Sequence, residues 1–190
     1  DISEFDDIAS KDQYQRALGE GFSSEEALYF VNKRSRDNSR TPMQWDNSKN
    51  AGFSKDENSK SWIKLTGSQA TTNVADQIND KDSIFSHYKK MIDLRQNGKY
   101  SDCLTFGDFI SVPLENEKII AYVRKYKNQK VLCISNFSEL KQEVKLSEIA
   151  KALGEKEIKI GEILINNFDG FEKDGEKVVF EGFQSLLVEI

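Results

Sequence analysis

The 190-residue sequence contains few of the residues that build metal, redox and nucleophilic sites. Its two cysteines, Cys103 and Cys133, lie in apolar surroundings without CxxC spacing, so free core thiols are favoured over a bridge or a metal site. The single histidine, His87, cannot form a zinc site by itself, and nothing else indicates a Ser-His-Asp triad. Gly19 and Gly21 lack the third glycine and the preceding strand of a phosphate-binding loop. We therefore predict no metal site and no organic cofactor.

Long apolar runs and strong charge of one sign are also missing. No stretch approaches the roughly 20 apolar residues that span a bilayer, and the N-terminus lacks a basic region followed by an apolar one. The net charge of -5 comes from interspersed acidic and basic residues, which argues against a nucleic-acid partner. These absences predict a cytoplasmic protein without a membrane partner. Because the sequence begins at Asp1 without a methionine, we expect a piece of a longer chain or a trimmed one.

Two short helices and a long loop are predicted in the first part of the chain. Residues 11–18 contain helix formers, and Ser23 with Glu26 forms a capping-box pattern that opens a helix to about Arg34. Residues 35–72 are polar and loop-like, and a loop of this length inside a compact domain is usually functional.

A further helix is predicted over residues 82–97, capped by Asp82 and stopped by Gly98. Its apolar residues cover about half of its circumference, which suggests contact with two partners, such as a barrel and an appended domain. If that barrel is missing, the face is uncovered, and the chain should self-associate or bind a hydrophobic dye. The residues on this arc are Ile84, Phe85, Tyr88, Met91 and Ile92, with His87 as a boundary residue and Leu94 beside it.

After Gly98 the pattern changes to short apolar or alternating runs separated by turn signals, which predicts an antiparallel β-sandwich. Residues 147–153 are expected to form a short helix between strands. The aromatic residues of this region have neighbours typical of core positions, and we predict no exposed aromatic row. The predicted strands are 104–113, 119–126, 131–137, 142–146, 163–166, 178–181 and 185–190, and the aromatics are Phe106, Phe109, Tyr122, Tyr126, Phe137, Phe168, Phe171, Phe180 and Phe183.

The most informative segment is residues 35–46, SRDNSRTPMQWD, followed by Asn50-Ala51-Gly52-Phe53. It places charged, amide and hydroxyl groups and a tryptophan around one proline, without any helical or alternating apolar period, and that composition is typical of a binding loop. The segment resembles the Arg-Asp-Asn-x-Arg-Thr-Pro-Met-Gln-Trp-Asp loop of the oligo-1,6-glucosidase, dextran glucosidase and trehalose-6-phosphate hydrolase group in the α-amylase family, glycoside hydrolase family 13. Residues 82–85, 88–90 and 94–95 extend the resemblance.

The resemblance implies a mixed α and β chain from the end of such an enzyme. Residues 1–98 would be the substrate-side loop and last helix of a truncated (β/α)8 barrel, and residues 99–190 a C-terminal antiparallel β-sandwich. Retaining glycoside hydrolysis needs two carboxyl groups about 5 Å apart, and no Asp or Glu here stands in the context of that pair. The family's catalytic carboxylates would lie before Asp1. We therefore expect no catalytic residue in this chain, which by itself would be inactive.

The resemblance also implies part of a substrate site. Arg40 matches the family arginine that binds hydroxyls of the terminal glucose, and its fork of donors suits two vicinal oxygens. Arg36 and Asp37 are expected to support the loop through a charge-assisted pair. Trp45 is expected to anchor the loop against the barrel. Phe53 and Trp62 are interpreted in the same way.

Three functions remain open from the sequence. The first is the C-terminal part of a retaining, exo-acting α-glucosidase that cleaves α-1,6-linked glucose from isomalto-oligosaccharides, with the missing barrel as intramolecular partner. The second is the corresponding part of a trehalose-6-phosphate hydrolase. The third is a non-catalytic β-sandwich that binds carbohydrate or serves as a scaffold module.

Overall fold

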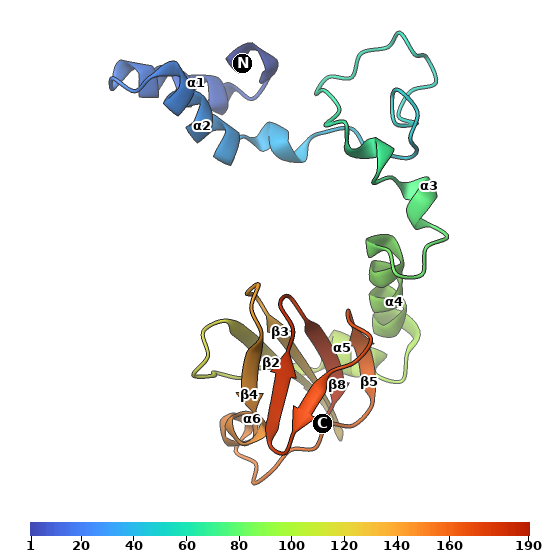
Figure 1. Cartoon of the computed structure of the whole chain (residues 1–190). Coiled ribbons are helices and arrows are strands. Elements are labelled where there is room, and N and C mark those ends of the chain that lie inside the picture. Colours follow the sequence, from blue (N-terminus) through green and yellow to red (C-terminus); the bar gives the residue numbers. More distant parts are fainter. The chain divides into compact units, whose positions relative to one another are not determined.

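The computed structural model describes residues 1–190, which form two units, Asp1–Ser86 and His87–Ile190 (Figure 1). The first unit contains short helices and a long loop, and the second contains every strand of the chain. The chain is therefore mixed α and β, as its sequence predicts, with all of its β structure in the C-terminal part.

In the first unit, a short 3-10 helix (Ile2–Glu4) precedes two packed helices, α1 (Ile8–Gly19) and α2 (Ser24–Arg34). The predicted capping box is confirmed. The Ser23 hydroxyl accepts a hydrogen bond from the Glu26 N–H, and the Glu26 carboxylate accepts one from the Ser23 N–H. Small apolar side chains on the two helices are buried, namely Ala17, Ala27 and Val31. The first helix begins at Ile8, three residues before the predicted start.

The segment that follows α2 is mostly irregular, as predicted. It contains two 3-10 turns, Arg36–Ser39 and Ser68–Ala70, and ends at the short helix α3 (Val74–Gln77). Its two ends are tied together at one place. The carbonyl of Gln44 accepts from Val74 N, the carbonyl of Trp45 accepts from Ala75 N, and Gln44 Nε2 donates to the Thr72 carbonyl, each at 2.9 Å. Residues 46–72 are therefore a long excursion that is closed at its base.

Helix α4 (Ile84–Asn97) ends before Gly98, as predicted, but its cap is Ser83 and not Asp82. The Ser83 hydroxyl accepts from Ser86 N at 3.1 Å, whereas Asp82 lies in the preceding turn, where its N–H donates to Asp80. The expected apolar face of α4 is uncovered, and no residue of this helix is buried. The exposed members of the face are Ile84, Phe85, Tyr88, Met91 and Ile92.

The second unit contains two antiparallel sheets, which confirms the predicted sandwich. One sheet has the strand order β1-β2-β3-β8-β5 and the other β4-β7-β6. Strand β6 was missed by the sequence analysis because its three residues are polar and exposed. The bounds are β1 Asp108–Ser111, β2 Ile119–Tyr126, β3 Gln129–Asn136, β4 Gln142–Lys145, β5 Ile163–Asn166, β6 Glu172–Asp174, β7 Lys177–Phe180 and β8 Ser185–Glu189.

Alternation along the strands directs one set of side chains into a single core. In β2, Ile119, Ala121 and Val123 are buried while Ile120 between them is exposed. The core also includes Phe180 from the smaller sheet and the buried face of helix α6 (Leu146–Leu153), which matches the helix expected between strands. The apolar period of 2 in the strands therefore fixes which face of each sheet is buried.

The expected strand 104–113 is wrong in its first half. Residues Ser101–Phe106 form helix α5, and the strand begins only at Asp108. The physical reason is a second cluster on the outer face of the larger sheet, where Tyr100, Cys103 and Leu104 pack on Val131. Between helix and strand the backbones approach so closely that a Cβ on Gly107 would lie 2.4 Å from the carbonyl oxygen of Cys103. Both cysteines are free, as predicted.

The predicted burial of the aromatic residues is wrong for most of them. Phe180 is buried, and Tyr122, Tyr126 and Phe171 are partly buried. The exposed ones lie at a helix end, on an edge strand or in loops between strands, where the alternation that marks core positions does not hold. They are Phe106, Phe109, Phe137, Phe168 and Phe183.

Candidate functional site

The predicted binding loop is attached to the N-terminal residues by the carboxylate of Asp37. Its Oδ2 accepts hydrogen bonds from the backbone N–H groups of Asp6 at 2.8 Å and Asp7 at 2.9 Å. Asp37 lies in the 3-10 turn Arg36–Ser39, and its side chain is almost completely buried. The Ser35 hydroxyl accepts from Asp37 N and starts this turn. The local fold therefore holds one carboxylate in a fixed position.

Arg40 is positioned by the other oxygen of the same carboxylate. Its Nη1 lies 3.5 Å from Asp37 Oδ1, and its backbone N–H donates to the Asp37 carbonyl at 3.1 Å. The Arg40 side chain is 36% exposed, and its other guanidinium nitrogens have no partner among residues 1–190. One edge of the guanidinium is thus held, and the remaining donors are available to a ligand.

The expected pair between Arg36 and Asp37 is not formed, because each residue has a different partner. Arg36 donates through Nε and Nη2 to Asp7 Oδ1, at 3.0 and 2.5 Å. The hydrogen bonds from Arg36 lower the pKa of Asp7 to about 2. Ser10 Oγ lies 2.9 Å from both Asp7 Oδ2 and Ser35 Oγ, which completes a buried polar cluster. Arg36 therefore joins the loop to the start of α1, and its role as loop support stays a prediction.

Asp7 is the important residue that the sequence analysis missed. It occupies the N-cap position of α1, yet its side chain makes no capping hydrogen bond because it faces Arg36 and Ser10. An aspartate directly before a helix is a recognisable cap signal. Its distant partner Arg36 leaves no such signal in the sequence.

Trp45 contributes to the loop through its backbone. Its N–H donates to the carbonyl of Ala51 at 2.8 Å, and its indole is 51% exposed among residues 1–190. Ala51 and Gly52 have φ angles of 52° and 66°, so the chain reverses through two successive left-handed residues. Phe53 and Trp62 are also exposed. The expected burial of these aromatics against a barrel stays a prediction.

The surface cavities of the first unit include the following two. One, of about 400 Å³, is bordered by Asp37 and contains the ion pair between Lys64 and Glu4, which lowers the pKa of Glu4. Its lining residues are Asp1, Glu4, Phe5, Asn32, Asp37, Asn38, Thr41, Ile63, Lys64, Leu65 and Thr66.

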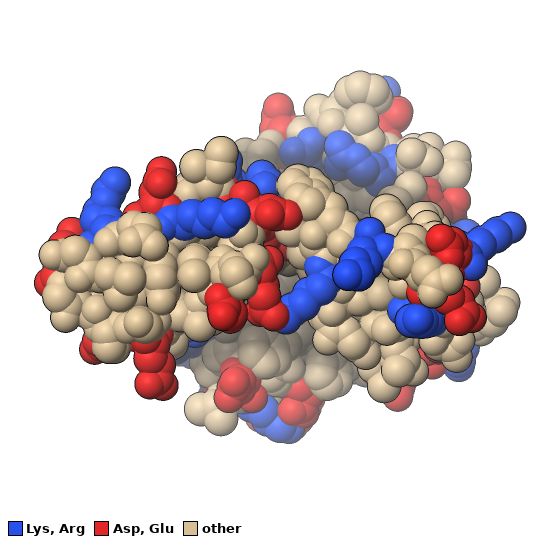
Figure 2. All heavy atoms as spheres, turned by 90° about the horizontal axis from the view of Figure 1, so that it is seen from above, with Lys and Arg blue, Asp and Glu red and all other residues tan.

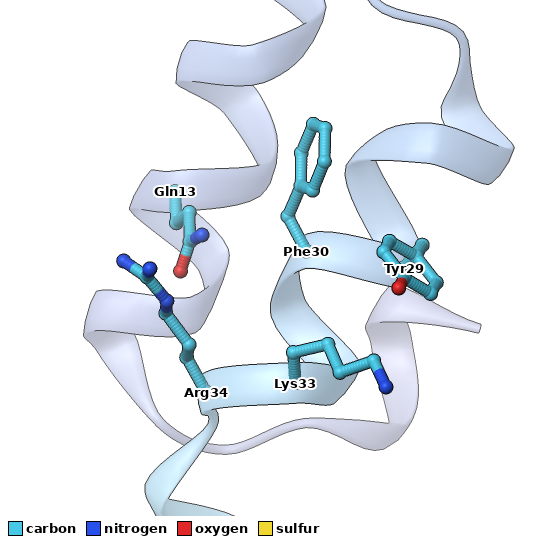
Figure 3. A pocket seen from close by; sticks show the side chains of 5 residues that line it. All are labelled: Gln13, Tyr29, Phe30, Lys33 and Arg34. Atoms are coloured by element: carbon cyan, nitrogen blue, oxygen red, sulfur yellow. The ribbon is translucent and has the colours of Figure 1, made fainter.

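The other cavity, of about 350 Å³, lies between α1 and α2 and contains no predicted site residue. In Figure 3, Arg34 extends toward Gln13, and Lys33 extends beside Tyr29, with its Nζ 5.3 Å from the ring centroid.

No group of three or more His, Cys, Asp or Glu side chains is arranged to hold a metal ion. On the face drawn in Figure 2, basic side chains lie among acidic ones and form no extended patch of one sign. None of the helices has both the length and the apolar character needed to cross a membrane.

Comparison with protein families identifies the chain. Residues 8–104 match the family "Alpha amylase, catalytic domain". The chain belongs to the α-amylase family. Residues 119–187 of this family member match a second family, the C-terminal domain of the α-amylase SusG.

Individual relatives of this α-amylase family member match most or all of its length. The oligo-1,6-glucosidase of Bacillus cereus is 31% identical over 196 residues, which cover 100% of this chain and 32% of the relative. The trehalose-6-phosphate hydrolase of Bacillus subtilis is 34% identical over 72% of this chain and 23% of the relative. The crystal structure of trehalose-6-phosphate hydrolase from Bacillus licheniformis superposes with a TM-score of 0.83 and 30% identity, over 100% of this chain and 32% of that one. The chain thus spans about a third of the relatives that it matches.

Proposed function

We propose that residues 1–190 are part of a retaining, exo-acting α-glucosidase that hydrolyses α-1,6-glucosidic bonds of isomalto-oligosaccharides. The oligo-1,6-glucosidase of Bacillus cereus, which aligns with all of this chain, supports the substrate class. On this proposal, residues 1–98 complete the catalytic barrel and residues 99–190 form a C-terminal β-domain. The family matches at 8–104 and 119–187 support this order of domains.

The catalytic carboxyl groups are proposed to come from the part of the parent enzyme that these 190 residues do not include. Retention requires a nucleophile and an acid about 5 Å apart across the scissile bond. The Asp and Glu side chains around Arg40 have other functions, since Asp37 and Asp7 are held by backbone N–H groups and by Arg36. The 190-residue chain is therefore expected to be inactive by itself, and no organic cofactor is proposed.

The observation that carries the proposal is the position of Arg40. Binding of the terminal glucose requires a donor fork that is already oriented, because ordering a free side chain on binding costs about 0.5–1.5 kcal/mol. The buried Asp37 carboxylate supplies that orientation while leaving most of the guanidinium open. Arg36 and Trp45 hold the loop on either side, through Asp7 and through the Ala51 carbonyl.

Trehalose-6-phosphate hydrolysis is the second candidate. It is supported by the relatives of that name from two Bacillus species, one of which aligns with this whole chain. The same loop and the same arginine would serve it, because both substrates present a terminal glucose. The third possibility, a free-standing β-sandwich module, is less well supported, because the catalytic-domain match covers half of the chain.

The test is steady-state kinetics of the parent enzyme, expressed from its complete gene, on isomaltose, trehalose-6-phosphate and maltose. The expected result is highest kcat/KM on isomaltose, with a loss of tenfold or more in Arg40→Ala. Arg16→Ala, which removes an exposed arginine of α1, should match the wild type. A preference for trehalose-6-phosphate would select the second candidate. Equal kinetics of Arg40→Ala and wild type would remove Arg40 from the substrate site.

A further inference from the structure

The cavity of about 400 Å³ that Asp37 borders, here called the N-terminal cavity, is assembled from three segments that are distant in sequence. Two contacts hold these segments together. The Asp37 carboxylate accepts hydrogen bonds from the backbone N–H groups of Asp6 and Asp7. Lys64 Nζ lies 2.8 Å from Glu4 Oε1. The cavity therefore has preformed walls. The three segments are 1–5, 32–41 and 63–66.

Part of the lining of the N-terminal cavity is apolar. Ile63 is buried, and Phe5 and Leu65 are partly buried. Such side chains exclude water from one side of a bound molecule and contact its C–H groups. An apolar lining with a small number of polar groups is the usual composition of a small-molecule site.

Polar groups with unused hydrogen-bonding capacity complete the lining. The Asn32 amide and the Thr41 hydroxyl make no hydrogen bond to any other group of residues 1–190. The Asn38 amide donates to the Asn32 carbonyl at 2.9 Å, which leaves its oxygen able to accept. Amides and hydroxyls both donate and accept. The cavity therefore matches a ligand whose own groups do the same, such as the hydroxyls of a sugar.

The charges around the cavity favour a neutral ligand. Three carboxylates line it, those of Asp1, Glu4 and Asp37, against the single ammonium group of Lys64, so an anion would meet repulsion. A cation is not favoured either. The Glu4 carboxylate is paired with Lys64, and the Asp37 carboxylate is occupied by two backbone N–H groups and by Arg40.

We propose that the N-terminal cavity binds a neutral monosaccharide, at a site separate from the one proposed for Arg40. The cavity lies within the usual size range of ligand pockets, about 300–1,000 Å³, and Arg40 does not line it. Glucose is the probe, a choice that rests on the proposed function because that reaction releases glucose. Since Asp37 lines the cavity and also holds Arg40, a bound sugar would border the residue that orients the substrate arginine.

The experiment is equilibrium dialysis of this chain against radiolabelled glucose. Wild type and Arg40→Ala should each bind one glucose per chain with the same Kd. Thr41→Val and Asn32→Ala should each raise the Kd about 2- to 12-fold, as expected when one hydrogen bond to the ligand is lost. Thr72→Val, which changes an exposed threonine outside the cavity, is the matched control and should bind as the wild type does.

The parent enzyme supplies a second measurement, because dialysis against glucose requires no turnover. Its bound glucose should include one molecule that Thr41→Val weakens and Thr72→Val does not. Glucose 6-phosphate should bind to the chain more weakly than glucose, because it adds negative charge.

Several results would overturn the proposal. They are the absence of saturable binding to the chain, an unchanged Kd in both Thr41→Val and Asn32→Ala, and a parent without glucose binding that depends on Thr41. Loss of binding in Arg40→Ala would assign the glucose to the substrate site, and tighter binding of glucose 6-phosphate would contradict a neutral ligand. A parent that binds glucose in this way but lacks glucosidase activity would refute the proposed function alone.

Discussion

Replacing Asp37 by asparagine or by alanine should separate two functions of one carboxylate. Oδ2 holds the N-terminal residues through two backbone N–H groups, and Oδ1 holds Arg40. Asparagine can place its oxygen toward the two N–H groups and keep both hydrogen bonds, but its NH2 group then faces the Arg40 donors. Alanine loses the acceptor on both sides.

The expected magnitudes follow from these contacts. In Asp37→Ala, the N–H groups of Asp6 and Asp7 lose their acceptor, and each costs about 1–3 kcal/mol when buried. We therefore expect about 2–6 kcal/mol of lost stability, toward the lower end because the Asp6 group is only partly buried. In Asp37→Asn, only the partly exposed ion pair is lost, which costs about 1 kcal/mol or less. Freeing the Arg40 side chain should weaken transition-state binding by about 0.5–1.5 kcal/mol, or about 2- to 12-fold in kcat/KM.

Urea unfolding of the chain, followed by tryptophan fluorescence, measures the first quantity selectively, because both tryptophans, Trp45 and Trp62, lie in the first unit. The kinetics of the parent on isomaltose measure the second. Equal destabilisation by the two substitutions would contradict the assignment of the two oxygens. If Asp37→Asn keeps wild-type kcat/KM while Arg40→Ala loses activity, Asp37 does not position Arg40.

Three further outcomes are expected. The pKa of Asp7 is lowered to about 2 in the folded chain, so its stabilising contribution is complete above about pH 4 and is lost as the pH falls toward 2. The difference in unfolding free energy between wild type and Asp7→Asn should therefore shrink between about pH 4 and about pH 2. A difference that stays constant with pH would argue against the ion pair. Gly182→Ala should lower the midpoint of thermal unfolding, because its Cβ would clash with a backbone carbonyl. Gly170→Ala should not lower it, because a Cβ at that position has open space. Equal midpoints for the two variants would show that the loop backbone can shift to accommodate the Cβ of residue 182. Burial raises the pKa of the Cys103 and Cys133 thiols. At neutral pH both thiols should therefore react slowly with a thiol reagent in the native chain and rapidly in guanidinium. Fast reaction in the native chain would place them outside the core.

Regular elements were predictable wherever the signal was local. The Ser23 capping box and the alternation in β2 depend on residues close in sequence, and both predictions were confirmed. Helix α5 was missed because its apolar residues continue into an apolar strand, and only packing on Val131 separates them. The cap of α4 was assigned to Asp82 in place of its neighbour because both residue types suit that position.

The residues of the proposed site were indicated by the sequence, but the contacts between them were not. The composition of residues 35–46 indicated Arg36, Asp37 and Arg40. Arg36 pairs with Asp7, about thirty positions away, and Arg40 pairs with Asp37 on the neighbouring turn. No sequence rule for residues close together in the chain predicts that Arg36 pairs with Asp7. Exposure of the sandwich aromatics was also unpredictable, because a residue such as Phe168 in a polar loop has the same composition whether it meets core, solvent or another domain.

The closed base of the 46–72 excursion gives the chain a place where its length can vary. Its ends are tied by backbone hydrogen bonds of Gln44 and Trp45 to the start of α3, and these bonds do not involve the tip. Doubling the length of a flexible loop costs only about 0.6 kcal/mol in closure entropy. Insertions or deletions near the tip would therefore keep the hydrogen bonds at the base and the contact of Arg40 with Asp37. Chains that differ in the length of this excursion are therefore expected to keep the contact between Arg40 and Asp37 unchanged.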